Sequence, residues 1–150
     1  MSEPTAPGWP YPGAQWWKMD FHVHTPASMD AKAWRRAVGT QDEVTPEKWL
    51  LQSMGAGLDC VAVTDHNTGE WIDRLKEADA NLEANQPRGF RPLYLFPGVE
   101  LSVNGGFHLL ALFGFEKTAS DIDTLLALSG RSGHGEIYGC SLPASRLPSR

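Results

Sequence analysis

Histidine and carboxylate side chains recur at the ends of short apolar runs in this chain of 150 residues. The first run closes with His22 and His24, and Asp20 precedes them. Residues two positions apart in a β-strand point to the same side, so the two imidazoles should project together while Phe21 and Val23 face a helical layer. Paired imidazoles chelate borderline metals such as zinc, and Asp20 could orient His22. Alone, such a pair is more often incidental.

A second polar cluster, Asp65-His66-Asn67, follows directly after the apolar run Leu58–Thr64. Burial of polar groups in this position costs free energy unless they form hydrogen bonds or belong to a functional site. Asp65 and Asn67 could be turn and capping residues before the next helix, and we accept that interpretation for Asn67. For His66 we predict a role in a site.

Glu100 stands between Val99 and Leu101 and should therefore face away from two core residues. A lone buried carboxylate is protonated or paired, and bridging two cations would pair it; a surface glutamate on an edge strand is the alternative. His108 is the polar residue of the apolar run Phe107–Phe113, where a lone histidine is usually a satisfied core residue. Because four consecutive strand-like runs each supply a histidine or a glutamate, we predict one shared metal site.

The elements that must position these residues alternate between strands and helices. Strands are expected at Lys18–His24, Leu58–Thr64, Leu93–Leu101 (interrupted at Pro97-Gly98) and Phe107–Phe113. Helices are expected from a Thr45 cap to Gly55 or Gly57, from near Thr68 through Leu82, and from Ser120 to Gly130. Continuous apolar runs are typical of strands buried on both faces of a parallel sheet. This alternation predicts the α/β class, in which active sites collect at the carboxyl ends of the strands.

Composition and length narrow the classes of function. The formal net charge of −5 argues against a surface that coats nucleic acid. Cys60 lies in an apolar run and should be a buried thiol, and it forms no CxxC motif with Cys140. The first residues lack the features of a signal peptide, and no apolar stretch is long enough to cross a bilayer. We therefore expect a cytoplasmic protein with no membrane partner.

Three zones are expected along the chain. Residues 1–15 are rich in Pro and Gly and should form an irregular arm, residues 16–129 should form a partial domain, and residues 130–150 should form a flexible tail. His134, in the tail, is expected to be a solvated loop histidine. The tail does not resemble a further strand and helix, so we expect it to be truncated.

Four motifs, in this order, resemble the first motifs of the PHP (polymerase and histidinol phosphatase) superfamily: DFHVHTPAS, VAVTDHNT, PGVELSV and GFHLLALF. The resemblance covers roughly residues 16–128, and the order, strand context and spacing of the motifs all agree with it. The residues around them look most like the PHP domain of ATPase-associated, TrlF-like proteins.

The resemblance implies the N-terminal part of a distorted (β/α)7 TIM-like barrel that binds two or three divalent ions, commonly Zn, Mn or Fe. It implies that His22 and His24 bind one ion, that Glu100 bridges to a second held by His108, and that His66 serves a third. Glu100, Asp65 and His66 are the expected catalytic residues. The implied reaction is hydrolysis of a phosphate ester by metal-activated water. The expected substrate is a phosphorylated small molecule or a nucleic-acid end, and an ATPase domain is a possible partner.

Two alternatives stay open beside a phosphoesterase. The metal ligands that the family supplies further along its sequence have no counterpart here. We therefore expect a fragment whose site must be completed by another polypeptide or by a dimer, and the sequence leaves its activity open. The chain could instead be a non-catalytic metal-binding or regulatory PHP module of an ATPase- or polymerase-linked protein. A metal-dependent amidohydrolase also places an HxH pair after its first barrel strand, but it does not lead us to expect TDH and Gly-x-Glu on the next two strands.

Overall fold

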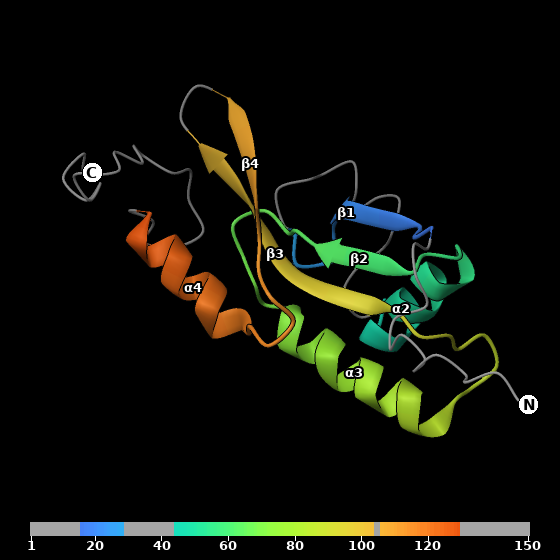
Figure 1. Ribbon diagram of the computed structural model, residues 1–150. Coiled ribbons are helices and arrows are strands. Elements are labelled where there is room, and N and C mark those ends of the chain that lie inside the picture. The colour runs from blue at the N-terminus through green and yellow to red at the C-terminus, as the bar shows by residue number, and fades with distance from the viewer. Residues whose placement is uncertain (1–15, 29–43, 104–105, 130–150) are drawn as a thin grey trace, which may run out of the picture.

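The structure is a computed structural model that describes residues 16–28, 44–103 and 106–129 (Figure 1). The predicted arm 1–15 and tail 130–150, with His134 and Cys140, lie outside the described residues, so the division into three zones stays a prediction. The elements are β1 (Met19–Val23), α2 (Pro46–Gly55), β2 (Cys60–Val63), α3 (Ile72–Asn85), β3 (Tyr94–Val103), β4 (Phe107–Leu112) and α4 (Ala119–Leu128).

The four strands form one mixed sheet in the order β1-β2-β3-β4. The first three strands run parallel, and β4 runs antiparallel to β3. This arrangement confirms the predicted α/β class. The twisted sheet (Figure 1) is compatible with part of a TIM-like barrel, whereas four strands do not establish a (β/α)7 count.

The core lies on the face of the sheet that the helices cover. Val61, Val63 and Val99 project into it from the strands, and apolar residues of α2, α3 and α4 pack against them. Helix α2 begins as predicted, because the Thr45 side chain accepts a hydrogen bond from Lys48 N and Pro46 occupies the first turn. Cys60 is a buried free thiol, as predicted.

Helix α3 begins at Ile72, four residues after the predicted start at Thr68. The amide of Ile72 donates to the carbonyl of Gly69 (3.0 Å), so a turn precedes the first helical residue. Among the described helices, none is long and apolar enough to cross a membrane.

Strand β3 continues through Pro97 and Gly98, where we predicted an interruption. At Pro97 it ends its pairing with β2, opposite Val63, and at Gly98 it begins its pairing with β4, opposite Leu112. The Pro97 carbonyl still accepts a hydrogen bond from Phe113 N (2.9 Å). A proline is tolerated here because the ladder changes partner at this residue.

Strand β4 is not the doubly buried, parallel strand that we predicted. It is antiparallel to β3, and Leu109 and Leu110 are 55% and 43% exposed. Only residues 104–106 separate the two strands, whereas a parallel return needs a crossover of about a dozen residues or more. Asn104-Gly105-Gly106 is a hairpin signal that we could have used, but the apolar composition of the strand pointed the other way.

Phe21 also differs from its prediction, because it does not face the helical layer. Its ring lies edge-on to Phe96, with centroids 5.5 Å apart, and neither residue belongs to the core beneath the helices. The register between β1 and β2 shifts between Asp20 and Val23. Such an irregularity adds a residue to one strand and breaks the strict alternation of sides.

Candidate metal centre

The Glu100 carboxylate is the centre of the candidate site. Glu100 is 3% exposed and lies within β3. Its backbone amide donates to the Asp65 carbonyl (3.0 Å), and its own carbonyl accepts from Asn67 N (2.8 Å). The loop after β2 thus holds the backbone of Glu100 from one side.

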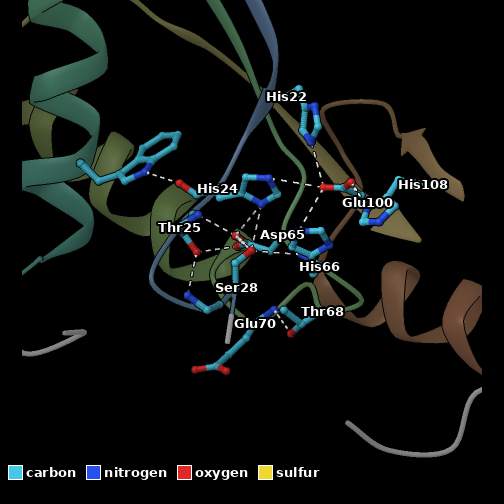
Figure 2. Close-up of polar contacts among 12 residues, drawn as sticks. His22, His24, Thr25, Ser28, Asp65, His66, Thr68, Glu70, Glu100 and His108 are labelled. Carbon is cyan, nitrogen blue, oxygen red and sulfur yellow. Dashed lines mark hydrogen bonds and ion pairs between the residues drawn. The ribbon is translucent and has the colours of Figure 1, made fainter. Parts of the chain in front are cut away.

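Four imidazoles surround this carboxylate (Figure 2). Glu100 Oε2 lies 2.8 Å from His22 Nε2, 3.3 Å from His24 Nε2 and 3.5 Å from His66 Nε2. Glu100 Oε1 is hydrogen-bonded to His108 Nδ1. The rings of His24 and His66 are stacked, with centroids 4.8 Å apart. The structure therefore brings together all five residues predicted to bind metal.

The topology explains how these side chains meet. His22 and His24 lie at the carboxyl end of β1, and His66 follows the carboxyl end of β2. His108 reaches the same place from the start of β4, where it lies opposite Ser102. Because β4 is antiparallel, its beginning is next to the end of β3. His108 thus reaches the cluster on a strand that runs opposite to the predicted direction.

The surroundings of Glu100 favour its ionised form. Burial raises the pKa of this carboxyl, while hydrogen bonds from His22 and His108 and the charges of nearby imidazoles lower it, and the pKa is lowered overall. One oxygen of this carboxylate, Oε2, thus faces imidazole nitrogens of His22, His24 and His66. Such a set of nitrogen and carboxylate donors fits a borderline divalent cation.

Two groups of described residues could each hold a metal ion, and both include Glu100. One is His22, His24 and Glu100, and the other is His66, Glu100 and His108, with the ligand atoms of each group within 4.8 Å of one another. His66 thus lies with His108, whereas the resemblance implied a separate third ion for it. The number and identity of the ions stay predictions.

The site has an open side and an adjoining cleft. The side chains of His22 and His108 are 51% and 49% exposed. A cleft of about 540 Å³ lies between β1 and α2, and its lining includes His22, His24, Trp49 and Gln52. A molecule bound at the cluster could therefore extend along β1.

Asp65, predicted to be catalytic, is only 1% exposed and lies beneath the cluster. Its Oδ1 accepts hydrogen bonds from Thr25 N (2.6 Å) and Ser28 Oγ (2.8 Å), and its Oδ2 accepts from Thr25 Oγ1 (2.5 Å). Burial raises the pKa of this carboxyl against the effect of these hydrogen bonds. Asp65 lies 4.0 Å from His24 Nδ1 and belongs to neither group of potential metal ligands. Its contacts hold Thr25 and Ser28 next to the histidine pair.

Asn67 and Asp20 have contacts other than those we predicted. Asn67 has a positive φ of 51°, and its side chain accepts from Ser102 N (3.1 Å) and donates to Ser102 Oγ (3.2 Å), so it joins the loop to β3. The carboxylate of Asp20 accepts from the backbone amide of His22 (3.1 Å) and not from its ring.

Sequence reasoning missed Thr25 and Ser28, which are both fully buried. Ser28 Oγ lies 2.9 Å from His24 Nδ1 and accepts from His66 N (3.1 Å). Trp49 Nε1 donates to the carbonyl of His24 (3.0 Å). The one available signal was the position of Thr25 and Ser28 directly after the histidine pair, and short hydroxyl residues in such a place usually indicate a turn.

Comparisons with known proteins do not assign a family. No protein-family model matches the chain, and no curated protein matches it. Among solved structures, it is similar to an amidohydrolase from Chromobacterium violaceum, solved with bound sulfate and no metal. The two are 21% identical with a TM-score of 0.43, and the match covers 75% of this chain and 33% of that one. The chain thus spans about a third of the amidohydrolase, and a similarity this low identifies neither a family nor a reaction.

Proposed function

We propose that this chain carries a metal-dependent hydrolase site of the PHP type that acts on phosphate esters. The observation that supports it best is the sharing of one buried carboxylate, Glu100, by two groups of potential metal ligands. A carboxylate between two cations has both of its oxygens paired, which offsets the cost of its burial. The order of the motifs in the sequence favours a phosphoesterase over other metal-dependent hydrolases.

In this proposal the site has residues that bind metal and space that takes the substrate. His22, His24, His66, Glu100 and His108 would hold two or three ions of Zn, Mn or Fe. Such ions acidify water and neutralise charge on a phosphoryl oxygen when bound. Glu100 keeps the negative charge that attracts them, and the exposed rings of His22 and His108 leave room for a phosphate group. The cleft beside β1 would take the organic part of the substrate, which is a phosphorylated small molecule or a nucleic-acid end.

The first test is the metal content of the folded chain, purified without chelator and measured by plasma mass spectrometry. We expect at least one equivalent of Zn, Mn or Fe per chain. The double variant His22→Ala/His24→Ala should lose metal and keep its circular dichroism spectrum. A folded wild-type chain that stays metal-free after incubation with each of the three ions would contradict the proposal.

The second test is turnover, measured on the metal-loaded chain with panels of phosphomonoesters, phosphodiesters and N-acyl amides. Hydrolysis of phosphoesters that the double variant lacks is the expected result. Hydrolysis of amides alone would contradict the phosphoesterase assignment while keeping the metal site.

The alternative is a non-catalytic metal-binding or regulatory module of an ATPase- or polymerase-linked protein. Exposed aromatic residues favour it: Tyr94 in β3 and Phe115 in the turn after β4 are each 50% exposed, and a larger assembly would cover them. Bound metal without turnover on any panel is the result that this alternative predicts. Its partner would then be an ATPase domain, and addition of ATP should change the affinity of the two proteins.

A further inference from the structure

Ser28 contacts three groups at once, and their chemistry fixes how its hydroxyl is used. A serine hydroxyl offers one hydrogen and two lone pairs. His66 N is an obligatory donor 3.1 Å from Ser28 Oγ and therefore takes one lone pair. Asp65 Oδ1 is an acceptor 2.8 Å away and therefore takes the hydrogen. The second lone pair is left for His24 Nδ1, at 2.9 Å.

Thr25 strengthens this assignment, because it keeps Asp65 in the role of an acceptor. Asp65 Oδ1 also accepts from Thr25 N (2.6 Å), which can only donate. Thr25 Oγ1 accepts from Ala27 N (3.1 Å), so its own hydrogen is free for Asp65 Oδ2 (2.5 Å). Figure 2 shows this network directly beneath the ring of His24.

We propose that Ser28, held by Asp65 and Thr25, positions His24 as the tautomer with hydrogen on Nδ1, so that Nε2 presents its lone pair to a metal ion. His24 Nε2 lies 3.3 Å from Glu100 Oε2, on the side of the ring that faces the cluster. The inference rests on the metal-binding role proposed for His24. Ser28, Thr25 and Asp65 are positioning residues, because they act on the metal through an imidazole.

The direct test is nitrogen-15 NMR of the histidine rings in the metal-free, full-length chain at alkaline pH. His24 is identified by the resonances that disappear in His24→Gln. We expect Nδ1 to be protonated and Nε2 to be unprotonated in the wild-type chain. Protonation at Nε2 instead, or an even mixture of tautomers, would overturn the assignment whether or not the variants described next fold.

The variants test the consequence for metal. Ser28→Ala should mix the tautomers of His24 and weaken zinc binding about 10- to 100-fold, as measured by calorimetry. Thr25→Val should act in the same direction through Asp65, and Thr25→Ser, which keeps the hydroxyl, should restore wild-type behaviour. Unchanged zinc affinity in both Ser28→Ala and Thr25→Val would overturn the positioning role.

Failure of this inference can be told apart from failure of the proposed function. A wild-type chain with the Nδ1-protonated tautomer that binds none of the three ions would overturn the metal site and support the hydrogen-bond assignment. A chain that binds zinc with wild-type affinity after Ser28 is replaced would overturn the role of Ser28 and support the metal site.

Discussion

At the scale of residues, one carboxylate determines the chemistry of the site. Glu100 is buried, carries a lowered pKa and touches imidazoles from three different segments. Taken alone, each of these histidines has an ordinary structural explanation that needs no metal. Their convergence on a single carboxylate is what makes a structural role for all of them difficult to defend.

The first prediction concerns the charge of Glu100. Glu100→Gln keeps the size of the side chain and removes its negative charge. It should therefore weaken zinc binding by at least about 100-fold, which is more than the loss of a residue that only hydrogen-bonds to a metal ligand. Both groups of ligands should be affected, because both include Glu100. Calorimetric titration with zinc measures this effect, and Glu70→Gln, at an exposed residue outside both groups, is the control. Loss of one equivalent of metal with the other retained would contradict a shared carboxylate.

The ligand residues could be predicted from the sequence, because histidines and a glutamate stand out in apolar runs. The residues behind them could not. Thr25 and Ser28 are small hydroxyl residues that look like turn residues, and their burial depends on the Asp65 carboxylate 37 to 40 positions further along the chain. Contacts of this kind exist only in the folded chain.

At the scale of elements, the direction of β4 is the main point that sequence reasoning missed. Apolar composition reports burial on average, and it does not report strand direction. Direction follows from the length of the connection, which is three residues here. By contrast, the starts of helices α2 and α4 were predicted to within one residue. Thr-Pro-Glu before α2 is a local signal that needs no tertiary context. The capping box of Thr118 and Asp121, which the prediction did not use, places the start of α4 at Ala119.

A second prediction concerns the close approach of β3 to β2 at Gly98. A Cβ atom at this position would lie 2.9 Å from the Val63 carbonyl oxygen and 3.0 Å from Thr64 Cγ2. Gly98→Ala should therefore destabilise the fold by about 1–3 kcal/mol, the usual cost of overpacking. Urea denaturation measures this change. The control is Gly55→Ala at the end of α2, where nothing lies within 4 Å, and stability there should stay equal or rise by up to about 1 kcal/mol.

A third prediction concerns the pH dependence of the first turn of α4. The Asp121 carboxylate accepts from Thr118 N (2.9 Å), and this bond, with Lys117 nearby, holds the pKa of Asp121 below its ordinary value of 3.8. A lowered pKa in the folded state means that the carboxylate stabilises the fold at pH values above 3.8, and that this contribution is lost as the pH falls through the folded pKa.

Asp121→Asn should therefore lower the melting temperature near neutral pH, and the difference from wild type should shrink as the pH falls below 3.8. Thermal melts recorded by circular dichroism across this pH range test the prediction. Asp123→Asn, at an exposed residue two positions further along the same helix, should show a much smaller difference. A difference that grows in acid would contradict the direction of the pKa shift.

At the scale of the whole molecule, the described sheet has one covered face and one open face. On the open face, edge-on and tilted ring contacts link Trp17 to Tyr94, Tyr94 to Phe115, and Phe115 to Phe96. Trp17 is 44% exposed, and Tyr94 and Phe115 are 50% exposed. Apolar surface of this kind is typical of a face that another part of a protein covers.

Strand β4 lies at the edge of the sheet, and among the described residues no strand pairs with its outer side. Leu109 and Leu112 are 55% and 45% exposed, and an apolar edge without a charged residue pairs readily with another chain. We therefore predict reversible self-association of the isolated chain as its concentration rises. Leu109→Lys should weaken this association about tenfold, because burial of a half-exposed leucine contributes about 1.5 kcal/mol, and a charge opposes edge pairing. Leu128→Lys is the matched control, since Leu128 is 81% exposed but lies at the end of α4. Sedimentation velocity distinguishes the two variants, and equal weakening by both would show that association does not use the edge of the sheet.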